Sequence, residues 1–136
     1  MAKDKDEKHP IRDAMREERR REEERAEKKK EDASTYNTQL GIAYLRQGDV
    51  PLAKEKLDRA LKENPDSPAV HSARAMLFDR MNDPKQADNE YQTALRLAPN
   101  DPDVSNNYAV YLCQHGRTDE GVKKFQEAMP AVKIFR

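Results

Sequence analysis

The stretch from residue 40 to residue 60 reads LGIAYLRQGDVPLAKEKLDRA, and its pattern returns twice at a spacing of 34 residues, in 74–94 and 108–128. Small residues recur at three places in each stretch: Gly41, Ala75 and Ala109; Ala53, Ala87 and Gly121; Ala60, Ala94 and Ala128. Large apolar residues recur between them: Tyr44, Phe78 and Leu112; Leu57, Tyr91 and Phe125. A fixed period of this length indicates a repeat protein.

Each period predicts two antiparallel helices joined by a tight turn. Gly48, Asn82 and Gly116 suit the left-handed conformation that ends a helix, and each is soon followed by a capping residue such as Asp49 or Asp83. Prolines stand where the first turn of a helix tolerates them. The predicted helices cover about 35–47, 50–63, 68–81, 84–97, 102–115 and 118–129.

This period and its small residues resemble the tetratricopeptide repeat. The resemblance implies an all-α, right-handed α-solenoid of three helix pairs, which binds other proteins and rarely catalyses. The predicted division is a spacer over 1–33, repeats over 34–67, 68–101 and 102–130, and a tail over 131–136.

Residues 1–33 form a charged arm with 12 basic and 12 acidic side chains and few apolar ones. Such a segment cannot bury a core of its own. Oppositely charged residues three or four apart favour a solvated helix, so the arm is predicted to be a spacer that is either helical or disordered. The alternative is a nucleic-acid-binding arm built on the basic runs 19–21 and 28–30, although the acidic runs between them cancel most of their field.

Composition excludes several classes of protein. The formal net charge is zero, so nothing draws the whole chain toward nucleic acid. A single cysteine, Cys113, excludes an internal disulfide framework. No apolar run approaches the roughly 20 residues of a membrane span.

Few residues are candidates for chemistry, and each has a structural interpretation. His71 is predicted to pack between helices, His115 to lie at a helix C-terminus, and Cys113 to act as a small apolar residue. No base is placed beside Cys113, and no second histidine or cysteine lies three or four residues from His71 or His115. We therefore expect no enzymatic activity, no cofactor and no metal.

In tetratricopeptide proteins the concave face is lined mainly by the first helix of each repeat. Carrying those positions over gives a partner-binding groove of eleven residues: Thr38, Ile42, Leu45, Arg46, Ser72, Met76, Asp79, Arg80, Asn106, Val110 and Gln114. Ile42, Met76 and Val110 form an apolar stripe for a protein or peptide partner, flanked by Arg46 and Arg80. Alternatively, Ile42 and Val110 are partly buried by the neighbouring repeat. In tetratricopeptide domains that clamp the acidic tails of chaperones, the positions of Thr38 and Ile42 typically carry Lys and Asn. Thr38 and Ile42 therefore argue against a chaperone-tail clamp.

A narrower resemblance rests on 40–49 (LGIAYLRQGD), 86–88 (QAD) and above all 106–113 (NNYAVYLC). These runs resemble the PilF/PilW family of type IV pilus biogenesis lipoproteins. The resemblance implies a periplasmic scaffold, tethered to the outer membrane by a lipid, that helps localise and assemble the pilus secretin through its groove. It implies neither a cofactor nor a nucleic-acid partner. It also implies a lipid anchor that lies outside this chain.

The alternative is a cytoplasmic tetratricopeptide adaptor or co-chaperone-like protein of unknown partner. The chain opens with Met1-Ala2-Lys3-Asp4-Lys5 and shows no apolar signal segment, so this sequence alone predicts a cytoplasmic protein. At the other end, no polar capping helix follows the third repeat. We expect an exposed apolar edge around Val122, Phe125 and Met129 that promotes self-association.

Overall fold

Six α-helices make up the described part of this computed structural model, which covers residues 9–128. They are α1 (Pro10–Gln47), α2 (Val50–Glu63), α3 (Pro68–Arg80), α4 (Pro84–Leu97), α5 (Pro102–Gln114) and α6 (Thr118–Ala128). Within those residues there is no strand. The predicted all-α fold is confirmed.

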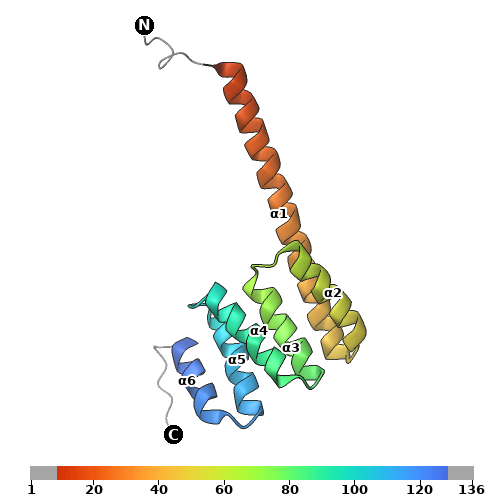
Figure 1. Cartoon of the computed structure of the whole chain (residues 1–136), viewed down its shortest axis with the longest axis vertical. Helices are drawn as coiled ribbons and strands as arrows, with labels where there is room; N and C mark the ends of the chain where they lie inside the picture. Colours follow the sequence, from red (N-terminus) through yellow and green to blue (C-terminus); the bar gives the residue numbers. More distant parts are fainter. Residues whose placement is uncertain (1–8, 129–136) are drawn as a thin grey trace.

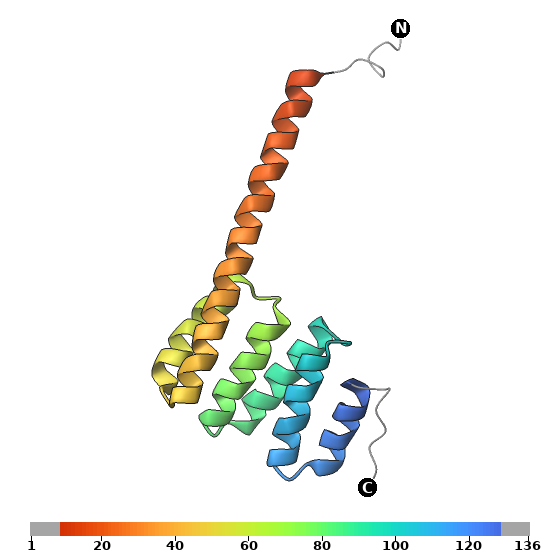
Figure 2. The same ribbon diagram turned by 180° about the vertical axis from the view of Figure 1, so that it is seen from behind.

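The helices form three antiparallel pairs, α1 with α2, α3 with α4, and α5 with α6, stacked side by side (Figure 1). The first helices of the pairs also contact one another, α1 against α3 and α3 against α5. These three helices therefore form one continuous face (Figure 2). The core is spread along this stack in two clusters, one around Leu57 and Leu77 and the other around Tyr91 and Leu112. This arrangement is the predicted α-solenoid.

Side-chain caps mark where α2, α3 and α4 begin. The carboxylates of Asp49 and Asp83 accept hydrogen bonds from the N–H groups of Leu52 and Gln86, both at 3.2 Å. Ser67 accepts one from the Val70 N–H group at 3.3 Å. The first helix of each repeat ends just before a residue with a positive φ angle. These residues are Gly48 after α1, Asn82 after α3 and Gly116 after α5, with φ angles of 81°, 58° and 75°. These local rules explain why helix boundaries are readable from sequence.

Small residues allow the paired helices to approach closely. A Cβ atom added at Gly41 would lie 2.6 Å from two atoms of the Leu57 side chain. At Gly121 the added atom would lie 2.9 Å from the Ala109 carbonyl oxygen and would also collide with Cys113 Sγ. Because the Ala109 obstacle is backbone, α5 and α6 would have to separate to admit a methyl group.

The charged arm is helical in its described part and continues into the first repeat without a break, because α1 begins at Pro10 and ends at Gln47. The predicted boundary at residues 33 and 34 therefore lies inside one helix. Ser34 Oγ donates to the Ala60 carbonyl oxygen at 2.9 Å, and Asn37 Nδ2 donates to Glu63 Oε1 at 2.5 Å. These two bonds hold α1 against α2 where the helix enters the stack, and the N-terminal part of the helix stands clear of the stack (Figure 1).

The last helix, α6, belongs to the predicted apolar edge. Val122 and Phe125 are half-buried in the structure. Met129 lies outside the described residues. Self-association through this edge stays a prediction.

Substituting Gly121 tests the close approach of α5 and α6. We expect Gly121→Ala to lower the free energy of unfolding by about 1–3 kcal/mol, the usual cost of overpacking a rigid contact. Urea unfolding followed by circular dichroism measures it, with Lys123→Ala as control, because Lys123 is exposed on the same helix. Equal stabilities for the two variants would show that the pair is not tightly packed.

Candidate functional site: the concave groove

The eleven predicted groove residues separate into a buried group and an accessible group. Thr38, Leu45 and Ser72 are 5%, 2% and 4% exposed, so they offer almost no surface to a partner. Thr38 Oγ1 donates to the Ser34 carbonyl oxygen at 2.7 Å, and Leu45 packs in a cluster with Leu77 of α3. The packing of the helices buries these three positions, which the family pattern places in the groove.

Five of the accessible residues line one depression of about 260 Å³ on the face formed by α3 and α5. They are Met76, Asp79, Arg80, Val110 and Gln114. Three further residues line it that the sequence pattern did not assign to the groove: Tyr91, Asn107 and Tyr111. This depression is the candidate binding site.

The remaining predicted residues lie outside the depression. Ile42 and Arg46 belong to α1, where Ile42 is half-buried against the core cluster and Arg46 is exposed. Asn106 is exposed on α5. Val110 is 40% exposed, so the neighbouring repeat does not bury it. The predicted apolar stripe is therefore accessible at Val110 and only partly so at Ile42.

Packed tyrosines support the depression from beneath. The ring of Tyr91, from α4, stacks on that of Tyr108 with centroids 4.9 Å apart and meets Tyr111 edge-on at 5.3 Å. Such aromatic pairs contribute beyond simple burial. Burial, aided by the Asp79 carboxylate, raises the pKa of Tyr91 above its ordinary value, so its phenol stays protonated at neutral pH.

Polar bonds hold the walls of the depression in place. Asn107 Nδ2 donates to Ser72 Oγ at 3.2 Å and links α5 to α3. At the far end, His115 Nε2 and Asp79 Oδ1 lie 2.7 Å apart. Met76 and Val110 thus present apolar surface between fixed polar groups, an arrangement suited to one apolar side chain of an extended protein segment.

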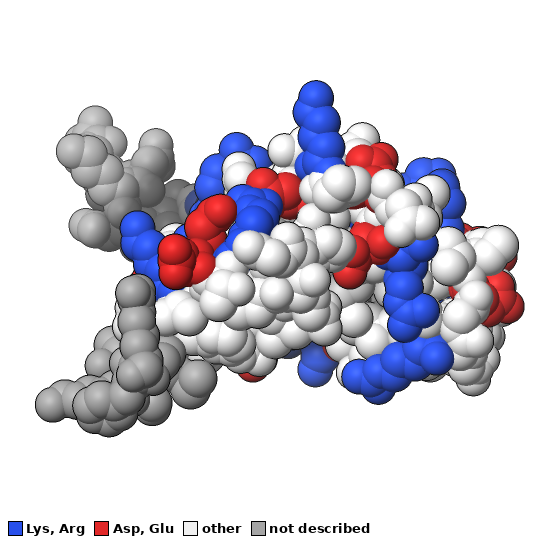
Figure 3. All heavy atoms as spheres, turned by 90° about the horizontal axis from the view of Figure 1, so that it is seen from below, with Lys and Arg blue, Asp and Glu red and all other residues white. Residues whose placement is uncertain are grey.

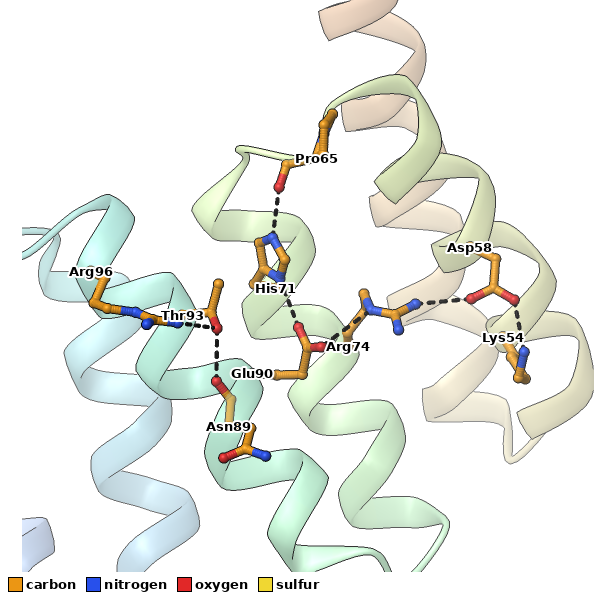
Figure 4. A network of polar contacts seen from close by, with 9 residues as sticks. All are labelled: Lys54, Asp58, Pro65, His71, Arg74, Asn89, Glu90, Thr93 and Arg96. Atoms are coloured by element: carbon orange, nitrogen blue, oxygen red, sulfur yellow. Dashed lines mark hydrogen bonds and ion pairs between the residues drawn. The ribbon is translucent and has the colours of Figure 1, made fainter.

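A second polar cluster joins the first two repeats away from the groove, and Figure 4 shows its members. Arg74 Nη1 donates to Asp58 Oδ1 of α2 at 2.9 Å, and Arg74 Nε lies 3.7 Å from Glu90 Oε1 of α4. His71 Nδ1 lies 2.7 Å from Glu90 Oε2, and His71 Nε2 lies 2.7 Å from the Pro65 carbonyl oxygen. The cluster links α2, α3, α4 and the α2–α3 loop.

His71 packs between α3 and α4, and it does so through polar contacts. Both of its ring nitrogens face acceptors, so only the doubly protonated cation donates to both. The hydrogen bond to Glu90, followed by the Pro65 carbonyl and the Glu90 charge, raises the pKa of His71, while burial and Arg74 oppose the rise. Sequence offers one signal for this role, a histidine at a repeat position that usually carries a large apolar residue.

The face of the repeats that lies farthest from the tip of the arm carries mixed charge. In Figure 3, Lys and Arg side chains alternate with Asp and Glu side chains around uncharged surface. No single-sign field covers this face. Neither a candidate metal-binding group of His, Cys, Asp and Glu residues nor a helix long and apolar enough to cross a membrane occurs in residues 9–128.

Comparison with known proteins identifies the class. A family model described as the tetratricopeptide repeat matches residues 38–79 and 72–132. The chain belongs to the tetratricopeptide repeat family and is a repeat scaffold for protein interaction. Proteins of this family are generally non-catalytic. No curated protein matches the chain.

Several solved structures are similar to the chain. PilF of Pseudomonas aeruginosa is 35% identical with a TM-score of 0.69, and the match covers 74% of this chain and 45% of PilF. PilW, titled a widely conserved type IV pilus biogenesis factor, is 28% identical with a TM-score of 0.65 over 71% of this chain and 44% of PilW. A MamA protein is 26% identical with a TM-score of 0.55, and the match covers 73% of this chain and 54% of MamA. The chain thus spans less than half the length of PilF and PilW.

Raising the pH through the pKa of His71 tests the polar cluster. Because the folded pKa lies above the ordinary value of about 6.5, the stabilisation by His71 is fully present below pH 6.5 and is lost as pH rises through the folded pKa. We expect His71→Gln to be destabilising at pH 5.5 and progressively less so at higher pH. Urea unfolding of both proteins at a series of pH values measures this. A stability difference that does not change with pH would contradict the assignment.

Proposed function

We propose that the chain acts in type IV pilus biogenesis as a non-catalytic scaffold for the pilus secretin. The similarity to PilF carries the proposal, because 35% identity extends over 74% of this chain. PilW, a second pilus biogenesis factor, supports the same assignment. The secretin as partner, a pilotin-like assembly role and a position at the periplasmic face of the outer membrane, through a lipid anchor outside this chain, belong to the proposal.

The depression between α3 and α5 is the proposed contact. Met76 and Val110 contribute apolar surface to it, and its polar groups include the Asn107 and Gln114 amides, the exposed Arg80 guanidinium and the Asp79 carboxylate, which lies 2.7 Å from His115 Nε2. Amides and a guanidinium suit the backbone and acidic groups of an extended segment. Met76 and Val110 supply the apolar anchor that such interfaces need at their centre.

A charge placed in the groove tests the proposal. In the source bacterium with the gene deleted, we expect loss of the assembled secretin multimer with unchanged monomer, and recovery when the gene returns. Val110→Glu is expected not to restore the multimer, because it places a carboxylate against the apolar anchor. The measurement is the amount of heat-resistant multimer in outer membranes.

Leu97→Glu is the matched control, because Leu97 and Val110 are both 40% exposed and Leu97 does not line the depression. We expect it to restore the multimer fully. Unchanged multimer in the deletion strain would overturn the pilus assignment and leave a tetratricopeptide adaptor of another partner. Equal rescue by both variants would overturn the role of the groove alone.

A further inference from the structure

The most exposed large apolar side chains in residues 9–128 all lie on α1. Ile11 is 78% exposed, Tyr36 63% and Met15 62%, whereas the next, Met81, is 44% exposed. At about 100° of rotation per residue, Ile11 and Tyr36 point within about 20° of each other, and Met15 lies about 40° from Ile11. Ala26 and Ala33 fall in the same sector, and we call these five residues the α1 stripe.

Four members of the α1 stripe are exposed and point away from the repeats, whereas Ala33 is half-buried where the arm meets the stack. The buried residues of α1 are Ser34, Thr38, Gly41 and Leu45, and they face α2 and α3. Tyr36 stands two residues from both Ser34 and Thr38, so it lies on roughly the opposite side of the helix. The arm stands clear of the stack, which leaves this side open along its length (Figure 1). Exposed apolar residues aligned on one side of a helix are unusual for a solvated spacer.

The charged residues within the same sector distinguish between the ways of pairing two arms. Glu18 and Glu22 lie toward the tip, and Lys29 lies toward the repeats. Two parallel arms in register would place Glu18 against Glu18 and Lys29 against Lys29, which is repulsive. Two antiparallel arms that place Ile11 against Tyr36 also bring Glu18 against Lys29, and Met15 beside Ala33. Glu18 is 58% exposed and contacts Arg25 only at 3.4 Å, so it has surface left for a partner.

We propose that two copies of this chain associate through antiparallel pairing of the α1 stripe. The occupant is a second copy because the stripe is complementary to itself in both apolar character and charge. Residues 10–33 carry nine basic and nine acidic side chains, so two arms do not repel each other overall. The stripe extends over 26 residues, from Ile11 to Tyr36, which is about seven turns of helix. Pairing this way holds the two grooves at opposite ends of the dimer.

Charge reversal tests both the association and its direction. In sedimentation equilibrium of the full chain, we expect dimers whose dissociation constant rises about tenfold on Glu18→Lys or on Lys29→Glu, since two contacts per dimer turn repulsive. The double variant is expected to return close to the original value. Glu31→Lys is the control, because it makes the same charge change on the opposite side of α1. A chain that stays monomeric up to about 1 mM, where even weak dimers are detectable, would overturn the proposal.

Disulfide trapping gives an independent test of direction. In a Cys113→Ser background, the double variant Met15→Cys with Ala33→Cys is expected to form a covalent dimer under mild oxidation. These positions are 18 residues apart, about 27 Å along one helix, so a bond between them within one chain is impossible. Met15→Cys alone is expected to give little dimer. A comparable dimer yield from that single variant, or tighter association on Glu18→Lys, would indicate parallel arms and contradict the proposal.

Discussion

The structure depends on the close approach of two helices in each repeat, which requires small residues at fixed places 34 residues apart. Leu57 fills the space left by the missing side chain of Gly41, and the backbone of Ala109 comes close to Gly121. Because every pair meets this constraint in the same way, the pairs stack with their first helices on one face. The groove exists because α3 and α5 lie side by side with Tyr91 of α4 beneath them. The site is therefore a product of helix packing rather than of any loop.

Polar interactions have a different role from the apolar core. The apolar clusters hold the helices of the stack together, whereas buried polar contacts set how one repeat meets the next. His71 and Arg74 of the second repeat bond to Pro65 and Asp58 of the first repeat. Tyr108 donates to Asp88, and burial together with this bond raises its pKa to about 12. Arg117 also donates to Asp88, at 3.1 Å, so the turn before α6 is joined to α4. Fixed junctions of this kind keep a three-repeat groove in one shape, which favours binding over flexibility.

The helices were predictable from sequence because their boundaries rest on local chemistry. Asp49, Ser67 and Asp83 each cap the helix that follows them. A cap of this kind is recognised from the neighbouring sequence alone, without knowledge of distant contacts. The site was predictable only in part. Five of the eleven proposed groove residues line the depression, but Thr38, Leu45 and Ser72 are covered by neighbouring helices, and Tyr91 reaches the depression from a second helix. Burial at a groove edge depends on how closely adjacent repeats approach, and a single sequence does not contain that distance.

The central claim is that partners bind on the face of α3 and α5. Site-specific photo-crosslinking in cells tests it directly, with the reactive side chain placed at Val110 in the groove or at Asn89, which is exposed on α4. The account predicts a protein adduct from Val110 and none from Asn89. An adduct from Asn89 with none from Val110 would contradict it, because binding would then occur on the helices that support the groove rather than on those that line it.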